Sequence, residues 1–153
     1  MLTQNSKAPE FEAIDDEGNT VSLSKFKGKK LVLYFYPKDN TPGCTTEAQD
    51  FRDLNEEIVK LNTLILGVSK DSTKSHQGFK QKYCLPFSLL TDSTGKMCED
   101  YGVWVEKSMY GKKYMGIERT TFLIDENGII KKIWNKVSVT NHAKEVLNTI
   151  KSL

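Results

Sequence analysis

The sequence predicts an α/β domain in which a central mixed β-sheet is flanked by helices in three layers. Short apolar runs with strand composition alternate with segments of helical periodicity, which is typical of parallel strands joined by helices. A hairpin signal followed by a last helix adds antiparallel pairing at the end of the chain. The 153 residues are about one domain in length. No repeat, low-complexity tract or linker divides them, so we expect a single domain over residues 1–153.

The first strands are predicted from apolar runs that turn residues interrupt. Two short runs, 11–14 and 21–23, enclose Asp, Glu, Gly and Asn residues and predict an N-terminal β-hairpin. Lys30–Tyr36 is a continuous apolar and aromatic run that stops at Pro37, and Thr63–Ser69 is a second such run. Continuous apolar runs suit strands that are covered on both faces, so we place these two in the middle of the sheet.

The last two strands and the helices follow from turn and periodicity signals. Thr120–Ile124 and Ile129–Trp134 flank the turn-rich sequence Asp-Glu-Asn-Gly, which predicts a hairpin. Apolar residues three and four apart, or a capping residue before them, predict four helices. These helices cover 44–62, 72–83 with Ser72 as N-cap, 95–101, and a last segment around 143–150 capped by Thr140 or Asn141. This order of elements is the pattern of a thioredoxin-like fold.

Composition excludes several classes of protein. The formal net charge is +2, which argues against a dedicated nucleic-acid binder. The longest apolar run, Leu31–Tyr36, is far shorter than the roughly 20 residues of a membrane span. Residues 1–16 contain no apolar segment typical of a secretory signal, so we expect a cytoplasmic protein.

The three cysteines, Cys44, Cys84 and Cys98, form no recognisable pairing pattern. An odd, low count without a Cys-x-x-Cys pair argues against a disulfide scaffold. With only His76 and His142 as further soft ligands, far apart in the sequence, we expect no metal site and no cofactor. The simplest interpretation is that all three are inert buried thiols. The alternative is that one of them is a reactive thiolate, and its local context must show which.

Cys44 is distinguished from the other two thiols by its position. It follows a buried strand and a polar loop framed by Pro37 and Pro42, and it opens a long amphipathic helix. Unpaired backbone N–H groups and the positive end of the helix dipole favour a thiolate there. Thr41, three residues earlier, can place a hydroxyl near the sulfur, where it can accept or donate a hydrogen bond. The simpler alternative is a loop with an incidental buried thiol.

These segments resemble the peroxiredoxins, and within them the bacterioferritin-comigratory-protein (peroxiredoxin Q) subfamily. The resemblance is carried by Ala8-Pro9 through LVLYFYPKDNTPGCTTE and by GIERTTFLID at 116–125, and it extends to about Trp134. It implies a thioredoxin-like fold and a thiol peroxidase that reduces hydrogen peroxide and organic hydroperoxides in antioxidant defence. It also implies a thiol reductant such as thioredoxin, glutaredoxin or glutathione. We expect a monomer or a weak homodimer.

Matched residue by residue, the resemblance makes Cys44 the peroxidatic cysteine. Thr41 and Pro37 become its loop partners, and Arg119 the distant arginine that faces the sulfur. The chemistry agrees, because negative charge moves onto the departing oxygen of the peroxide, and fixed donors aimed at it lower the barrier. The planar, permanently charged guanidinium of Arg119 supplies such donors. We expect Glu47, in the first turn of the same helix, to hold Arg119 in place.

The sequence departs from the subfamily at the cysteine that recycles the enzyme. Many members of the subfamily that this chain resembles carry a second, resolving cysteine five residues after the first. This chain has Gln49 at that position. Others carry it near the position of Lys80. Three routes stay open: an external thiol acting alone, Cys84 as the resolving cysteine, or Cys98, which we expect in the core.

Two further functions compete with a peroxidase. A thioredoxin-like disulfide reductase is disfavoured, because Cys44 is followed by Thr45 and Thr46 and not by a Cys-x-x-Cys pair. A non-catalytic redox sensor would oxidise at Cys44 and pass that oxidation to a partner protein.

Overall fold

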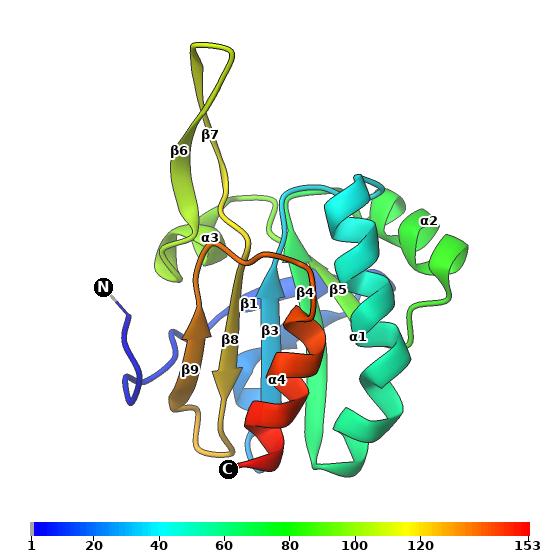
Figure 1. Ribbon diagram of the computed structural model, residues 1–153, viewed down its shortest axis with the longest axis vertical. Helices are drawn as coiled ribbons and strands as arrows, with labels where there is room; N and C mark the ends of the chain where they lie inside the picture. The colour runs from blue at the N-terminus through cyan, green and yellow to red at the C-terminus, as the bar shows by residue number, and fades with distance from the viewer. Residues whose placement is uncertain (1) are drawn as a thin grey trace.

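The structure, a computed structural model, describes residues 2–153 and has one large mixed sheet at its centre (Figure 1). Seven strands form this sheet in the order β2-β1-β5-β4-β3-β8-β9. The strands are β1 (Glu12–Asp15), β2 (Thr20–Ser22), β3 (Lys30–Phe35), β4 (Thr63–Ser69), β5 (Ser88–Thr91), β8 (Thr120–Ile124) and β9 (Ile130–Trp134). The helices are the 3₁₀ turn η1 (Leu23–Phe26), α1 (Pro42–Lys60), α2 (Thr73–Tyr83), α3 (Lys96–Asp100) and α4 (His142–Lys151).

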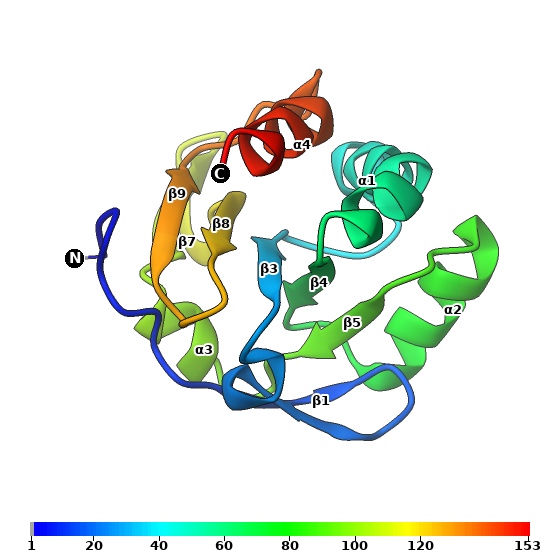
Figure 2. The same cartoon turned by 90° about the horizontal axis from the view of Figure 1, so that it is seen from below.

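The pairing confirms the predicted α/β fold with a mixed sheet. Strands β3, β4 and β5 run parallel, whereas β8 pairs antiparallel with β3 and with β9. Both predicted hairpins are present, β1–β2 at the N-terminal end and β8–β9 near the C-terminal end. Helices α1, α2 and α4 pack into the core on one face of the sheet and α3 into the core on the other, which gives three layers (Figure 2).

Strand β3 divides the two cores. Its successive side chains point to opposite faces, so Leu31, Leu33 and Phe35 belong to the core on the α3 side. Val32 and Tyr34 belong to the core beneath α1 and α4. Every one of these side chains is buried, as the continuous apolar run of this strand predicts.

Two features were not predicted from the sequence. Strand β5 has only four residues, too few for a clear pattern. Residues 105–115, a basic and aromatic segment that the sequence predicts to be a solvated loop, instead lie in a two-stranded hairpin, β6 (Trp104–Met109) with β7 (Lys112–Ile117), which projects from the body (Figure 1). Residues 108–115 are all exposed, so the outer part of the hairpin has no buried face and no apolar alternation to reveal it, although Ile117 at the base of β7 is buried in the core. Tyr110 and Gly111 both have positive φ, as a tight hairpin turn requires.

The helix starts follow from their capping residues. The hydroxyl of Ser72 accepts a hydrogen bond from the Ser75 N–H at 3.1 Å, which confirms Ser72 as the N-cap of α2. Helix α1 starts two residues earlier than predicted, because Pro42 occupies the first helical position, where its missing N–H costs no hydrogen bond. Within residues 2–153, no helix is both long and apolar enough to cross a membrane.

Candidate active site

Cys44 lies in the first turn of α1, at the end of the sheet where β3 finishes. Thr41 is the N-cap, so Cys44 is the third helical residue. Backbone N–H groups of a first turn have no partner within the helix, and the dipole makes this end positive, which favours an anionic sulfur. The side chain is 1% exposed. The predicted position of Cys44 in the first helical turn is therefore confirmed, and the sulfur is shielded from bulk water.

Arg119 contacts the sulfur directly. Its Nη2 atom lies 3.4 Å from the Cys44 Sγ, and its Nη1 donates to the Glu47 Oε1 at 2.7 Å. Strand pairing explains this reach. Phe35 and Thr120 are opposite one another in the β3–β8 pair, so the residue just before β8 lies beside the loop that follows β3.

Gly43 makes room for the arginine. A Cβ atom at this position would lie 3.1 Å from the Arg119 Nη2 and 3.8 Å from its Cζ. Because 3.1 Å is shorter than an ordinary carbon–nitrogen contact, any larger residue would displace the guanidinium. The absence of a side chain at Gly43 therefore helps to set the distance from Arg119 to the sulfur.

Glu47 is the second partner of Arg119, as expected from the sequence. Its side chain is 1% exposed, and its Oε2 has no hydrogen-bond partner among residues 2–153. Burial raises the pKa of Glu47 to about 7, although Arg119 lowers it. Burial lowers the pKa of Arg119, but the negative partners Glu47 and Cys44 outweigh it and raise that pKa overall. Arg119 thus remains charged, and Glu47 and Cys44 share its donors.

The loop partners lie close by but make different contacts. The Thr41 hydroxyl donates to the Lys38 carbonyl at 2.7 Å and not to the sulfur, so its lone pairs remain available to accept a hydrogen bond from a substrate O–H group. Pro37 is exposed directly after β3. Since proline has no N–H and a fixed φ, it contributes shape to the loop rather than a polar contact.

The other two thiols lie away from this site. Cys84 is exposed and ends α2 in a left-handed conformation, with φ 53° and ψ 48°. Cys98 is fully buried, as expected, and burial raises the pKa of its thiol. Arg52, a rival cation on α1, donates to the Tyr83 carbonyl at 2.9 Å and so joins α1 to the end of α2.

One functional neighbour was missed by sequence reasoning. Lys107, on β6, is half-buried, and its pKa is lowered by burial and by Arg119 while Cys44 raises it. The ammonium group therefore lies within the electrostatic field of the site. No local signal identifies it, because it belongs to the basic segment that reads as a loop.

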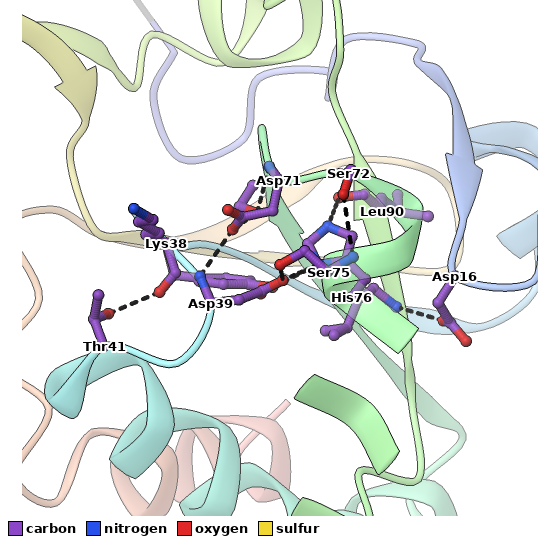
Figure 3. Close-up of polar contacts among 12 residues, drawn as sticks. Asp16, Lys38, Asp39, Thr41, Asp71, Ser72, Ser75, His76 and Leu90 are labelled. Carbon is purple, nitrogen blue, oxygen red and sulfur yellow. Dashed lines mark hydrogen bonds and ion pairs between the residues drawn. The ribbon is translucent and has the colours of Figure 1, made fainter. Parts of the chain in front are cut away.

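A second cluster of polar side chains, also missed, surrounds Asp39 in the loop between β3 and α1 (Figure 3). Ligand atoms of Asp39, Asp71 and His76 lie within 4.8 Å of one another, the kind of cluster that can hold a metal ion. Here each of these atoms is engaged in hydrogen bonds within the protein. His76 and Phe79 are three residues apart on one face of α2, and this spacing could have indicated that the histidine is buried.

Comparison with known proteins places this geometry in a family. The model of the AhpC/TSA family matches residues 5–133. The peroxiredoxin Bcp of Bacillus subtilis is 54% identical over 147 residues, which cover 96% of this chain and 94% of that protein. The peroxiredoxin Bcp of Escherichia coli is 42% identical over 144 residues, 94% of this chain and 92% of that protein.

Solved structures agree with the sequence relatives. Peroxiredoxin Q of Xanthomonas campestris superposes with a TM-score of 0.89 at 44% identity, over 93% of this chain and 90% of that one. A structure of the bacterioferritin comigratory protein of the same organism, with the same TM-score, identity and coverage, is described as giving insights into its alkyl peroxide reduction activity. These relatives are peroxidases and do not favour a non-catalytic redox sensor. The chain belongs to the AhpC/TSA family and, within it, to the Bcp or peroxiredoxin Q group of peroxiredoxins, which are thiol-dependent peroxidases.

Proposed function

We propose that Cys44 is the residue that peroxide oxidises, with Arg119, Thr41 and Pro37 forming its site. The contact of 3.4 Å between the Arg119 Nη2 and the Cys44 Sγ carries this proposal. A thiolate beside a guanidinium is stabilised as the nucleophile, and the same donor can follow the negative charge as it moves onto oxygen. Hydrogen peroxide and organic hydroperoxides are the proposed substrates, and the activity described for the Xanthomonas protein supports the alkyl class.

The proposed reaction transfers one oxygen atom of the peroxide to the Cys44 sulfur. The Cys44 thiolate attacks the nearer oxygen, the O–O bond breaks, and an S–O bond forms. Sulfur is oxidised to the sulfenic acid, and the peroxide is reduced to an alkoxide that takes up one proton as the alcohol. The Thr41 hydroxyl accepts a hydrogen bond from the peroxide, and Arg119 donates to the oxygen under attack.

We propose that an external thiol regenerates Cys44. That thiol displaces water from the sulfenic acid, and a second thiol reduces the mixed disulfide. Cys98 belongs to the core across the sheet from Cys44, so it lies on the wrong face to act as the resolver. Cys84 follows Tyr83, which is tied to Arg52; that arginine lies eight residues after Cys44, roughly 12 Å along the helix. A disulfide needs Cα atoms within about 7 Å, so this route requires α1 to unwind.

The partner and the location are proposed from the same chemistry. Thioredoxin, glutaredoxin and glutathione are the candidate reductants, and a compartment that keeps them reduced, the cytoplasm, is the proposed location. Cys44, Glu47 and Arg119 all come from one chain, which supports a monomer or a weak homodimer.

The test is hydroperoxide consumption by the purified protein with dithiothreitol as reductant. We expect Cys44→Ser to abolish consumption, because serine is not oxidised by peroxide, and Cys84→Ser to retain it. Cys98→Ala serves as the matched control for losing a buried thiol. Activity that survives in Cys44→Ser refutes the proposed role of this residue.

Mass spectrometry after one equivalent of peroxide separates the recycling routes. A sulfenic acid on Cys44 with no loss of the Cys84 thiol is expected for an external thiol. An intramolecular bridge between Cys44 and Cys84 would instead make Cys84 the resolving cysteine.

A further inference from the structure

The segment between β3 and α1 is anchored by a buried polar network that the reaction described above does not use. Asp39 lies at its centre (Figure 3). The Tyr36 hydroxyl donates to its Oδ1 at 2.6 Å, and the Ser75 hydroxyl donates to its Oδ2 at 2.8 Å. The backbone N–H of Asp39 donates to Asp71 at 2.8 Å. Asp39 is therefore held through its carboxylate by Tyr36, directly after β3, and by α2, and through its backbone N–H by the loop after β4.

His76 completes the network and must carry two protons or share one with Asp39. Its Nε2 lies 3.0 Å from the Leu90 carbonyl, which can only accept, so Nε2 bears a hydrogen. Its Nδ1 lies 2.8 Å from the Asp39 Oδ2, and one more proton must lie between these two atoms. The side chains are 0% and 2% exposed, so this hydrogen bond is fully buried.

The network also determines the shape of the segment that carries Thr41. On one side of Asp39, the Lys38 carbonyl accepts the Thr41 hydroxyl proton (Figure 3). On the other side, Asn40 is in the left-handed region with φ 62°. Both features depend on the backbone position of Asp39, which precedes Cys44 by only five residues.

This anchoring opposes a step that recycling requires. With its side chain 1% exposed, Cys44 cannot meet the sulfur of a second thiol while the segment stays in this position. The sulfenic acid becomes accessible only when residues 37–44 move outward. That movement pulls Asp39 away from His76 and leaves buried polar groups without hydrogen-bond partners, which is costly.

We propose that the hydrogen-bonded pair Asp39–His76 is a positioning element for the reaction at Cys44: it holds segment 37–44 in the arrangement that attacks peroxide and restrains the opening that admits a thiol. This inference rests on the proposed role of Cys44. The proposal predicts opposite changes in two rates when the pair is weakened. Loosening the pair slows oxidation of Cys44 by peroxide and speeds the capture of the sulfenic acid by an external reagent.

The experiment compares three variants with the wild type. Asp39→Ala/His76→Leu removes both partners of the buried hydrogen bond together, so that neither side chain is left buried without the other. His76→Asn is the conservative variant, because its amide nitrogen can replace Nδ1 as the donor to Asp39. Lys80→Met is the matched control, since it breaks the 3.1 Å contact with Asp16 on the same helix without touching the loop.

Two rates are measured on each folded protein by quenching and mass spectrometry: formation of the Cys44 sulfenic acid with hydrogen peroxide, and its trapping by dimedone. In the double variant we expect trapping to rise by roughly tenfold or more, as for the loss of a hydrogen bond to a charged group, and oxidation to slow. His76→Asn should restore much of the wild-type behaviour, and Lys80→Met should leave both rates unchanged.

Other outcomes overturn the inference. Unchanged trapping in the double variant, or an equal rise in Lys80→Met, shows that the pair does not control the opening. A fall in both rates, or no rescue by His76→Asn, shows only a general structural role and contradicts the proposal. If wild-type Cys44 forms no sulfenic acid at all, the proposed function itself fails, which the wild-type arm shows separately.

Discussion

The guanidinium of Arg119 contacts two acidic groups, and these shared contacts explain the roles of several neighbouring residues. One nitrogen serves the sulfur of Cys44, and another serves the carboxylate of Glu47. Because the guanidinium is planar, fixing one nitrogen on Glu47 also fixes the direction in which the other points. Glu47 cannot stabilise an anionic sulfur itself, so its contribution is the orientation of Arg119.

Gly43→Ala tests how tightly that orientation is set. The added Cβ would lie 3.1 Å from the Arg119 Nη2, so the guanidinium must move away from the sulfur. Complete loss of such a donor slows a reaction by about 10²–10³, so for a displaced donor we expect Cys44 oxidation to slow by about tenfold or more. Rapid-mixing kinetics with one equivalent of hydrogen peroxide measures this rate. Gly78→Ala on α2, where a Cβ meets nothing within 4 Å, is the control and should oxidise at the wild-type rate.

Glu47→Gln tests the protonation of the buried carboxyl. Since burial raises the pKa of Glu47 from 4.5 to about 7, its contribution to stability is full below pH 4.5 and is lost as pH rises through 7. A shift of that size corresponds to about 3 kcal/mol. We therefore expect the free energy of unfolding of Glu47→Gln, relative to the wild type, to improve by up to that amount from pH 4.5 to above 7. Urea unfolding across this range measures it, and a constant difference would contradict the raised pKa.

At the scale of elements, the sequence was most informative where one element buries a face. The apolar run of β3, the helical spacing of α1 and the Ser72 cap of α2 each encode burial or capping locally, and each is present in the structure. The outer part of the β6–β7 hairpin, residues 108–115, buries no side chain, so its sequence carries no comparable pattern.

The residues of the candidate site also differ in how far the local sequence predicts them. Cys44 and Thr41 lie next to a strand and a helix start, so their neighbourhood is encoded locally. Arg119 needed the family resemblance, because its approach to the sulfur depends on the pairing of β8 with β3. The contact between Asp39 and His76 joins residues 37 positions apart and has no local signature.

Helix α4 provides a prediction of its own through His142, its first residue. This side chain is buried, with its Nε2 2.8 Å from the Thr121 hydroxyl, and burial lowers its pKa from 6.5 to about 4. The neutral form stabilises the fold fully above pH 6.5, and that stability is lost as pH falls through 4, an effect of about 3 kcal/mol. We expect His142→Gln to lose correspondingly less stability on acidification from pH 6.5 to 4. Equal losses in both proteins, followed by circular dichroism in urea, would refute this origin.

On the scale of the whole molecule, the site lies where the layers meet. Cys44 comes from a helix on one face of the sheet, and Arg119 from the end of a central strand. The hydrogen-bonded pair of Asp39 and His76 joins the loop after β3 to α2 and, through Leu90, to β5. Three elements that are distant in the sequence thus hold one short loop, and changes far from the sulfur can alter its reactivity.

The projecting hairpin stands outside this arrangement and can be shortened without disturbing it. Met109 is 56% exposed and Tyr110 98% exposed, and Lys107 pairs with Tyr114 across the strands. Replacing residues 108–113 by Asn-Gly would keep that pair and close it with a favourable two-residue turn. Because the removed side chains bury no face, we expect the free energy of unfolding to change by less than about 1 kcal/mol. Peroxidase activity with dithiothreitol should also stay at the wild-type level, since Lys107 and Arg119 are retained. A large loss of either, measured by urea unfolding and peroxide consumption, would show that the hairpin tip supports the site.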